Sequence, residues 1–210
     1  MGRVLAFVTA MAMSAGMGSV AVAVTAPAVT RHHTAPRPYP NYLIGKTPMT
    51  LISLNTAALL MGVSKRTLWR RIAAGSLPVS RATDPQGRTL LALDDIAGDI
   101  GLPRAGLEEE VIATIEHADA GLAREQLELA LIYLEAGQTD KALSWLQLSA
   151  NQGDSEAMLF LGETQLQGKG ADYRAGLNWI RRAAIAGHPL ALEVMEALPG
   201  QLSARGDPTT

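Results

Sequence analysis

The C-terminal half of the chain repeats itself at an interval of 34 residues, and this period limits the possible folds more than any other feature. Residues of similar type recur in five columns, which are Val111, Trp145 and Trp179; Ile112, Leu146 and Ile180; Ala123, Ala157 and Ala191; Ala150 and Ala184; and Gly153 and Gly187. A fixed period of about 20 to 50 residues is typical of arrays in which each unit packs on the next. The C-terminal half is therefore predicted to be a row of repeated units.

Each repeated unit is predicted to be a pair of helices. Stacked repeats need roughly three units for stability, so we expect the flanking segments to contribute one helix each. Gly153 and Gly187 are expected to end helices in the left-handed conformation. The six helices that we expect to form a small right-handed superhelix cover residues 107–117, 123–135, 140–151, 155–167, 173–186 and 189–198.

The repeats resemble tetratricopeptide-like solenoids and, within them, the Sel-one-like repeat. The resemblance rests on Leu129, Ala130 and Tyr133, on Leu161 and Gly162, and on the matching stretches 141–154 and 175–188. Small residues at Ala130, Gly162, Ala150 and Ala184 are expected to let helices approach closely, and Trp145 and Trp179 to fill the space between units. The resemblance implies a module that binds another protein or assembles a dimer.

Upstream of the repeats, residues 53–74 have the pattern of two short helices that meet at a tight turn. Gly62 is free to take a positive φ in this turn, and Ser64 can cap the second helix. The apolar residues expected to face inward are Ala58, Leu59, Met61, Val63, Leu68 and Ile72. After the second helix we expect two short strands at residues 79–81 and 88–93, joined by a turn at 84–87, and then a helix capped at Asp94.

Residues 54–100 resemble the excisionase and MerR type of winged helix-turn-helix domain. The order of a first helix, Gly-Val-Ser, a basic second helix, Gly-Ser-Leu-Pro, a basic wing and an Asp-Asp helix start carries this resemblance. It implies duplex DNA binding, with the second helix in the major groove. We expect Arg66 and Arg70 to contact bases and Lys65, Arg71 and Arg88 to contact phosphates. The complete set of candidate DNA-binding residues is Ser64, Lys65, Arg66, Thr67, Arg70, Arg71, Arg81 and Arg88.

Charge is distributed unevenly along the chain, and this pattern suits the same interpretation. Residues 49–105 carry seven cations and four anions, a net charge of +3, whereas residues 106–210 carry seven cations and 16 anions, a net charge of −9. A basic module next to an acidic one is expected if the first binds phosphate and the second does not. The chain has no cysteine, which excludes disulfides, thiolate zinc sites and thiol nucleophiles.

The N-terminal segment permits three explanations. Residues 1–26 contain an apolar run from Val4 to Val24 and look like a signal peptide, which would send the protein to the periplasm or envelope. Alternatively, they form an uncleaved inner-membrane anchor. The favoured explanation places the translation start near Met49 and the protein in the cytoplasm. Residues 27–48 are interpreted as disordered linker, because the stretch 31–48 contains His32, His33 and the four prolines at 36, 38, 40 and 48 and shows no periodicity.

The sequence contains no motif for catalysis. We find no phosphate-binding glycine loop, no cluster of metal ligands and no nucleophile beside a base, so the protein is not expected to be an enzyme or to hold a cofactor or metal. His117 and His188 are interpreted as caps at helix C-termini. The residues Glu108, Glu109 and Glu110 are interpreted as a solvated cap at the start of the first repeat helix.

These observations predict a mainly α-helical protein with two modules. A small winged helix-turn-helix would cover residues 49–103, a short α-solenoid residues 106–198 and a tail residues 199–210. The function predicted is that of a DNA-binding transcriptional regulator or adaptor whose partners are duplex DNA, an unknown protein at the repeats and a second copy of the chain. The alternatives are an exported scaffold protein that does not bind DNA, and a membrane-tethered regulator.

Overall fold

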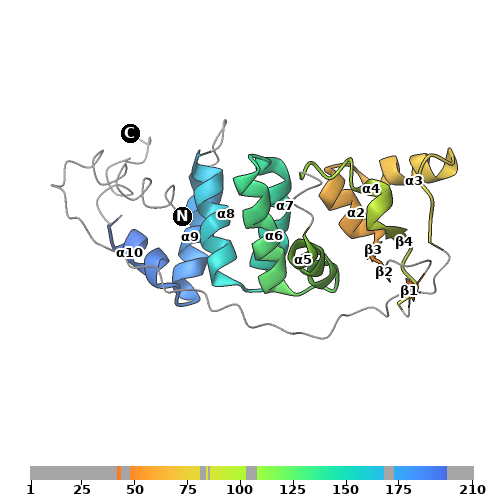
Figure 1. Ribbon diagram of the computed structural model, residues 1–210. Coiled ribbons are helices and arrows are strands. Elements are labelled where there is room, and N and C mark those ends of the chain that lie inside the picture. The colour runs from red at the N-terminus through yellow and green to blue at the C-terminus, as the bar shows by residue number, and fades with distance from the viewer. Residues whose placement is uncertain are drawn as a thin grey trace, which may run out of the picture. The chain divides into compact units, whose positions relative to one another are not determined.

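The computed structural model describes residues 42–43, 48–80, 84, 86–102, 108–167 and 173–197, all within one compact unit that spans residues 36–210. This part of the chain is mainly helical, as predicted (Figure 1). The apolar segment 1–26, most of the expected linker and the tail lie outside the described residues. Among the described helices, none combines the length and the apolar character that crossing a bilayer requires.

Two small antiparallel strand pairs lie at the N-terminal end of the described chain. Strand β1 (Tyr42–Leu43) pairs with β2 (Pro48–Met49), so two short pieces of the stretch interpreted as linker take part in backbone pairing. Strand β3 (Leu51–Ser53) pairs with β4 (Leu90–Ala92), with Ile52 opposite Leu91. Both of these side chains are completely buried. The strand pair therefore brings core residues together from two segments that are distant in the sequence.

Helices α2 (Leu54–Met61) and α3 (Lys65–Ala73) meet at the corner that the sequence predicts. Helix α2 ends at Gly62, whose φ of 66° lies in the left-handed region that glycine adopts without strain. Ser64 caps α3 by accepting a hydrogen bond from the backbone N–H of Thr67. Leu68 is fully buried and fixes the inner face of α3. The predicted turn glycine, cap and inward-facing leucine are therefore confirmed.

The segment after α3 differs from the predicted hairpin. Val79 and Ser80 do not form a strand, and the Ser80 N–H donates one hydrogen bond, 2.9 Å long, to the Leu90 carbonyl. Strand β4 instead has its full ladder with β3, because that register buries apolar side chains from both strands. Helix α4 (Leu93–Ile96) begins one residue before the predicted cap, so Asp94 lies in its first turn.

Six further helices follow, close to the predicted positions. They are α5 (Glu109–Asp119), α6 (Ala123–Glu135), α7 (Thr139–Asn151), α8 (Ser155–Gln167), α9 (Tyr173–Ile185) and α10 (Pro189–Ala197). Helices α6 and α8 have the predicted bounds, α7 and α9 differ by one residue at one end, and α5 lies two residues later at both ends. Helix α10 is described to Ala197, and residue 198 lies outside the described residues. Gly153 and Gly187 have φ values of 98° and 84° after α7 and α9, which confirms the predicted left-handed helix ends.

The two histidines predicted to cap helix C-termini have different positions. His117 is buried in the last turn of α5, as expected. His188 acts at the other end of a helix, because its Nδ1 accepts a hydrogen bond, 3.4 Å long, from the backbone N–H of Ala191 near the start of α10. The interpretation of His188 as a C-terminal cap is therefore wrong. A ring nitrogen that accepts a backbone N–H satisfies one of the free donors at a helix start.

Helices α5 to α10 pack in chain order, each against the helix before and the helix after it (Figure 1). Helices α8 and α9 come especially close at Gly162 and Gly176. A Cβ atom on Gly162 would lie 2.7 Å from the Gly176 carbonyl oxygen and 2.6 Å from Ile180 Cγ1. The predicted role of Gly162 in close helix approach is confirmed. Trp145 is buried as predicted, whereas Trp179 is half-buried and stacks its ring against the Arg182 guanidinium.

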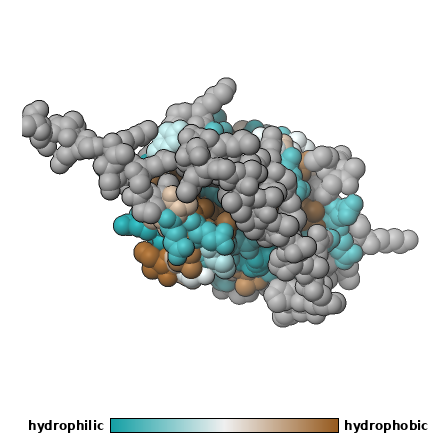
Figure 2. Space-filling view, turned by 90° about the vertical axis from the view of Figure 1, so that its left-hand side faces the viewer, coloured by the Kyte–Doolittle hydropathy of each residue, from teal (hydrophilic) through white to brown (hydrophobic). Residues whose placement is uncertain are grey.

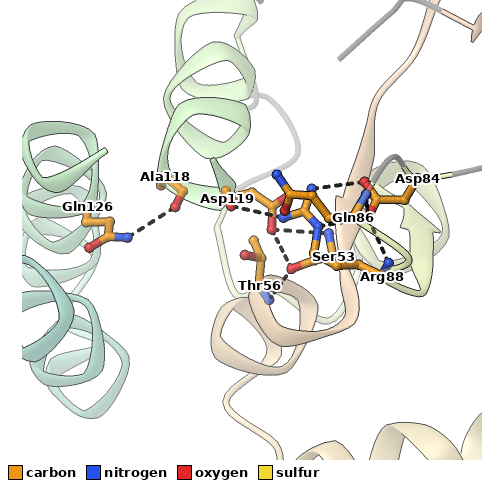
Figure 3. Close-up of polar contacts among 8 residues, drawn as sticks. All are labelled: Ser53, Thr56, Asp84, Gln86, Arg88, Ala118, Asp119 and Gln126. Carbon is orange, nitrogen blue, oxygen red and sulfur yellow. Dashed lines mark hydrogen bonds and ion pairs between the residues drawn. The ribbon is translucent and has the colours of Figure 1, made fainter. Parts of the chain in front are cut away.

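Buried polar contacts join the N-terminal elements to the helical row. The Ser53 hydroxyl, which caps α2, donates to Asp119 at the end of α5 (Figure 3). The Tyr133 hydroxyl of α6 lies 3.3 Å from the carbonyl oxygens of both Leu60 and Ile100. Lys141 Nζ of α7 donates to the same Ile100 carbonyl at 2.7 Å. The position of α2 is therefore set by helices that lie much later in the chain.

Candidate nucleic-acid interface

The outward face of α3 brings together three cationic side chains and one aromatic ring. Leu68 is fully buried and Ile72 half-buried, so the helix turns this side to the core. The large side chains of α3 that are exposed are Lys65, Arg66, Trp69 and Arg70. They lie next to one another, because residues three and four apart are neighbours on a helix surface. We call these four residues the α3 face.

The cations of the α3 face are not neutralised by neighbouring carboxylates. Helix α3 itself contains no acidic residue. In the part of the chain that the structure describes, no carboxylate lies within ion-pair distance of Lys65, Arg66 or Arg70. Three positive charges are therefore presented to solvent from one short, capped helix.

Lys65 and Arg66 lie in the first turn of α3, where the helix dipole is positive. A cation near this helix end opposes the dipole, an effect of about 0.3 to 1 kcal/mol for each charge. Folding gains nothing from this arrangement. A phosphate at the same position would be attracted by both side chains and by the helix end.

Two of the candidate DNA-binding residues, Ser64 and Thr67, stabilise the start of helix α3. The Ser64 hydroxyl accepts the Thr67 N–H at 3.2 Å, and its oxygen lies 3.0 Å from the Thr67 hydroxyl. These two side chains hold the first turn of α3 and position Lys65 and Arg66 beside it. Their structural role is the cap that the sequence predicted for Ser64.

Arg71 makes an ion pair with Asp99, which follows α4. The Arg71 Nη1 atom lies 2.7 Å from Asp99 Oδ2, and both side chains are partly exposed. An exposed pair of this kind contributes only about 0 to 1 kcal/mol to stability. It nevertheless connects the last turn of α3 to the segment after α4. Arg71 is therefore paired with a carboxylate, and we do not count it in the α3 face.

The Arg88 guanidinium lies among acidic side chains (Figure 3). It is already paired with carboxylates, unlike a side chain that is free to bind phosphate. Its guanidinium makes two bonds to the Asp84 carboxylate, with Nε 3.1 Å from Oδ2 and Nη2 3.2 Å from Oδ1. Its Nη1 lies 3.7 Å from Asp119 Oδ2. The guanidinium hydrogen bonds from Arg88 lower the pKa of Asp84. Arg81, the other residue expected at the wing, lies outside the described residues.

Asp84 also organises the turn that precedes β4. Its carboxylate accepts the backbone N–H groups of Gln86 and Arg88 at 3.1 and 2.7 Å. The Gly87 N–H donates to the Asp84 carbonyl, and Gly87 has a φ of 69°. The turn predicted at 84–87 is present in these contacts. It places Arg88 next to Asp119 and so links the turn to α5.

Trp69 is the residue of the α3 face that the sequence analysis missed. The residue is 50% exposed, and among the described large apolar residues that are exposed it is the one on α3. The helical spacing of the sequence already indicates this position for Trp69. Leu68 and Ile72 define the buried face, and Trp69 follows Lys65 and Arg66 by four and three residues, the spacing of one continuous outer face.

Within the described ranges, no group of three or more His, Asp and Glu side chains is placed to hold a metal ion. Comparisons of the chain with protein-family models, with curated proteins and with solved structures find no match.

Proposed function

We propose that the protein binds duplex DNA through the α3 face and acts as a transcriptional regulator or adaptor. The observation that carries this proposal is the joint exposure of Lys65, Arg66 and Arg70 on one capped helix, with no carboxylate of the described residues within ion-pair distance. Arginine forks are the commonest readers of guanine edges in the major groove, and an α-helix fits that groove. The resemblance of residues 54–100 to winged helix-turn-helix domains supports the same use of α3.

The proposal also assigns a role to the helical row. By their resemblance to Sel-one-like repeats, α5 to α10 would receive a protein partner or a second copy of the chain. The described part of this row exposes large apolar side chains on several helices, namely Leu122, Leu148, Tyr173, Ile185 and Leu192. Figure 2 faces the end that carries α9 and α10 and shows apolar surface beside polar surface there. One recognition helix reads few base pairs, so a dimer on two half-sites is expected.

Salt-dependent binding of labelled duplex DNA tests the proposal. Fluorescence anisotropy at several salt concentrations gives the slope of log Kd against log salt, which reflects the number of phosphates neutralised. The triple variant Lys65→Ala, Arg66→Ala, Arg70→Ala should bind at least about tenfold more weakly. The slope should fall by roughly 0.9 for each phosphate that the variant no longer neutralises.

The control is Arg181→Ala, which removes an exposed cation of α9 and leaves α3 intact. This variant should bind DNA like the wild-type protein. Equal losses in the triple variant and in Arg181→Ala would indicate nonspecific charge attraction and contradict the proposal. A wild-type protein that sediments as a monomer and shows no salt-dependent binding to duplex DNA would also exclude it.

A further inference from the structure

Trp69 lies in the middle of the α3 face, where neither folding nor charge explains it. Burying an indole ring stabilises a protein by a few kcal/mol, and Trp69 is 50% exposed as a residue. The neighbouring Leu68 occupies the core position instead. Tryptophan, which joins a large apolar ring to one N–H donor, is enriched at interfaces.

The charges around Trp69 restrict what can cover it. Lys65, Arg66 and Arg70 are exposed beside the ring and are not paired with a described carboxylate. A second copy that packed through this face would place like charges opposite each other, which is unfavourable. The partner must therefore supply negative charge around an apolar group.

The major groove of duplex DNA has this combination. Phosphates line its two edges, and the C5 methyl group of thymine is the apolar group that a base pair presents within it. Proteins that bind single strands by stacking use several aromatic side chains along a groove, whereas α3 carries one. These considerations favour a duplex over a single strand.

We propose that Trp69 is a specificity residue that packs against the C5 methyl group of a thymine in the major groove. This inference rests on the proposed binding of DNA by α3. In such a complex the flanking cations contact phosphates and guanine edges, and the indole distinguishes thymine from bases without a methyl group. The protein therefore selects sites that contain a thymine next to the bases read by Arg66 or Arg70.

The test uses duplexes selected by the wild-type protein from a random pool. Each thymine of the selected site is replaced in turn by deoxyuridine, which removes only the methyl group. The wild-type protein should bind one of these duplexes about fourfold more weakly, the effect of roughly 0.8 kcal/mol for one buried methyl group. Trp69→Ala and Trp69→Gln should bind the thymine and deoxyuridine duplexes equally.

The matched control is Tyr173→Ala, which removes an exposed aromatic ring from α9. It should keep the wild-type preference for thymine. Equal wild-type affinity for every thymine and deoxyuridine duplex would overturn the role of Trp69 and leave DNA binding intact. A thymine preference that persists in both Trp69 variants, or tighter binding to single strands than to duplexes, would also overturn it. Failure to bind any duplex would instead exclude the proposed function itself.

Discussion

Ser53 and Asp119 are 66 residues apart in the chain, yet the Ser53 hydroxyl donates a 2.5 Å hydrogen bond to Asp119 Oδ1. The Ser53 backbone N–H donates to the same oxygen at 3.2 Å. Because Ser53 also caps α2, the last residue of α5 holds the residue that starts the helical corner. Both residues are buried, so water does not replace these bonds when one partner is removed.

Replacing Asp119 by alanine should destabilise the protein by about 1 to 3 kcal/mol. The change leaves a buried N–H group of Ser53 without its acceptor and removes the second carboxylate beside Arg88. Urea denaturation followed by circular dichroism measures the free energy of unfolding. Glu135→Ala, at an exposed position near the end of α6, is the control and should change it by less than about 0.5 kcal/mol. Equal effects of the two changes would show that the contact contributes little.

Replacing Gly162 by alanine should destabilise the contact between α8 and α9 by about 1 to 3 kcal/mol. The new methyl group would lie 2.7 Å from the backbone oxygen of Gly176, so one helix must move. Alanine has the higher helix propensity, but this gain of roughly 0.5 to 1 kcal/mol is smaller than the packing loss.

Gly98→Ala is the matched control for Gly162→Ala. A Cβ atom at Gly98 would have no heavy atom within 4 Å, and the residue does not have a positive φ. This change should leave the protein unchanged or stabilise it by about 0.4 to 1 kcal/mol, because it restricts the unfolded chain. A thermal melting temperature that rises for both variants would contradict the close contact at Gly162.

The stability of the wild-type protein should fall between pH 4.5 and pH 7 because of Glu163. Burial raises the pKa of Glu163 from 4.5 to about 7, and among the described residues its Oε1 has no hydrogen-bond partner. In this range the folded state binds more protons than the unfolded state, so the contribution is full below pH 4.5 and is lost as pH rises through 7. The loss amounts to about 3 kcal/mol.

Glu163→Gln keeps the shape of the side chain and removes its ionisation. The difference in unfolding free energy between this variant and the wild-type protein should therefore grow with pH and level off above pH 7. Urea denaturation at pH 4.5, 6 and 8 measures this difference. Glu196→Gln, at an exposed site on α10, provides the comparison and should give a profile parallel to that of the wild-type protein. A parallel profile for Glu163→Gln would contradict the prediction.

Arg70→Ala should weaken binding to the preferred DNA site by about 1 to 3 kcal/mol and relax the base preference at one position. Arg70 is exposed on the α3 face and is not paired with a described carboxylate. Arg71→Ala should have a smaller effect, because Arg71 is already paired with Asp99. Competition binding with single-base variants of the site measures both effects. An equal loss on all sequences for Arg70→Ala would identify a phosphate contact.

Local patterns predicted the helices well because the signals that start and end them lie within a few residues. Gly62 and Ser64 mark the corner between α2 and α3, and Gly153 and Gly187 mark two later helix ends. These residues act through their own backbone conformation or a bond to a residue three positions away. Such features depend little on the remainder of the chain.

The features that sequence analysis missed depend on contacts between distant residues. Arg88 was expected to meet phosphate, but its position beside Asp119 follows from the packing of α5 against β3. Strand β4 forms its ladder with β3 rather than with Val79 and Ser80, because the buried faces of β3 and β4 match. No periodicity within one segment indicates which distant side chain will lie opposite it.

The hydroxyl of Tyr133 faces carbonyl groups at the end of α2 and after α4 and is buried with them. Separation of the corner from α6 would leave all three polar groups to find new partners at once. We therefore expect calorimetry to record a single cooperative transition for the folded region, and amide hydrogens in α2 and α6 to exchange with solvent at similar rates. A disturbance in α6 would therefore also loosen the corner of α2 and α3, which carries the α3 face.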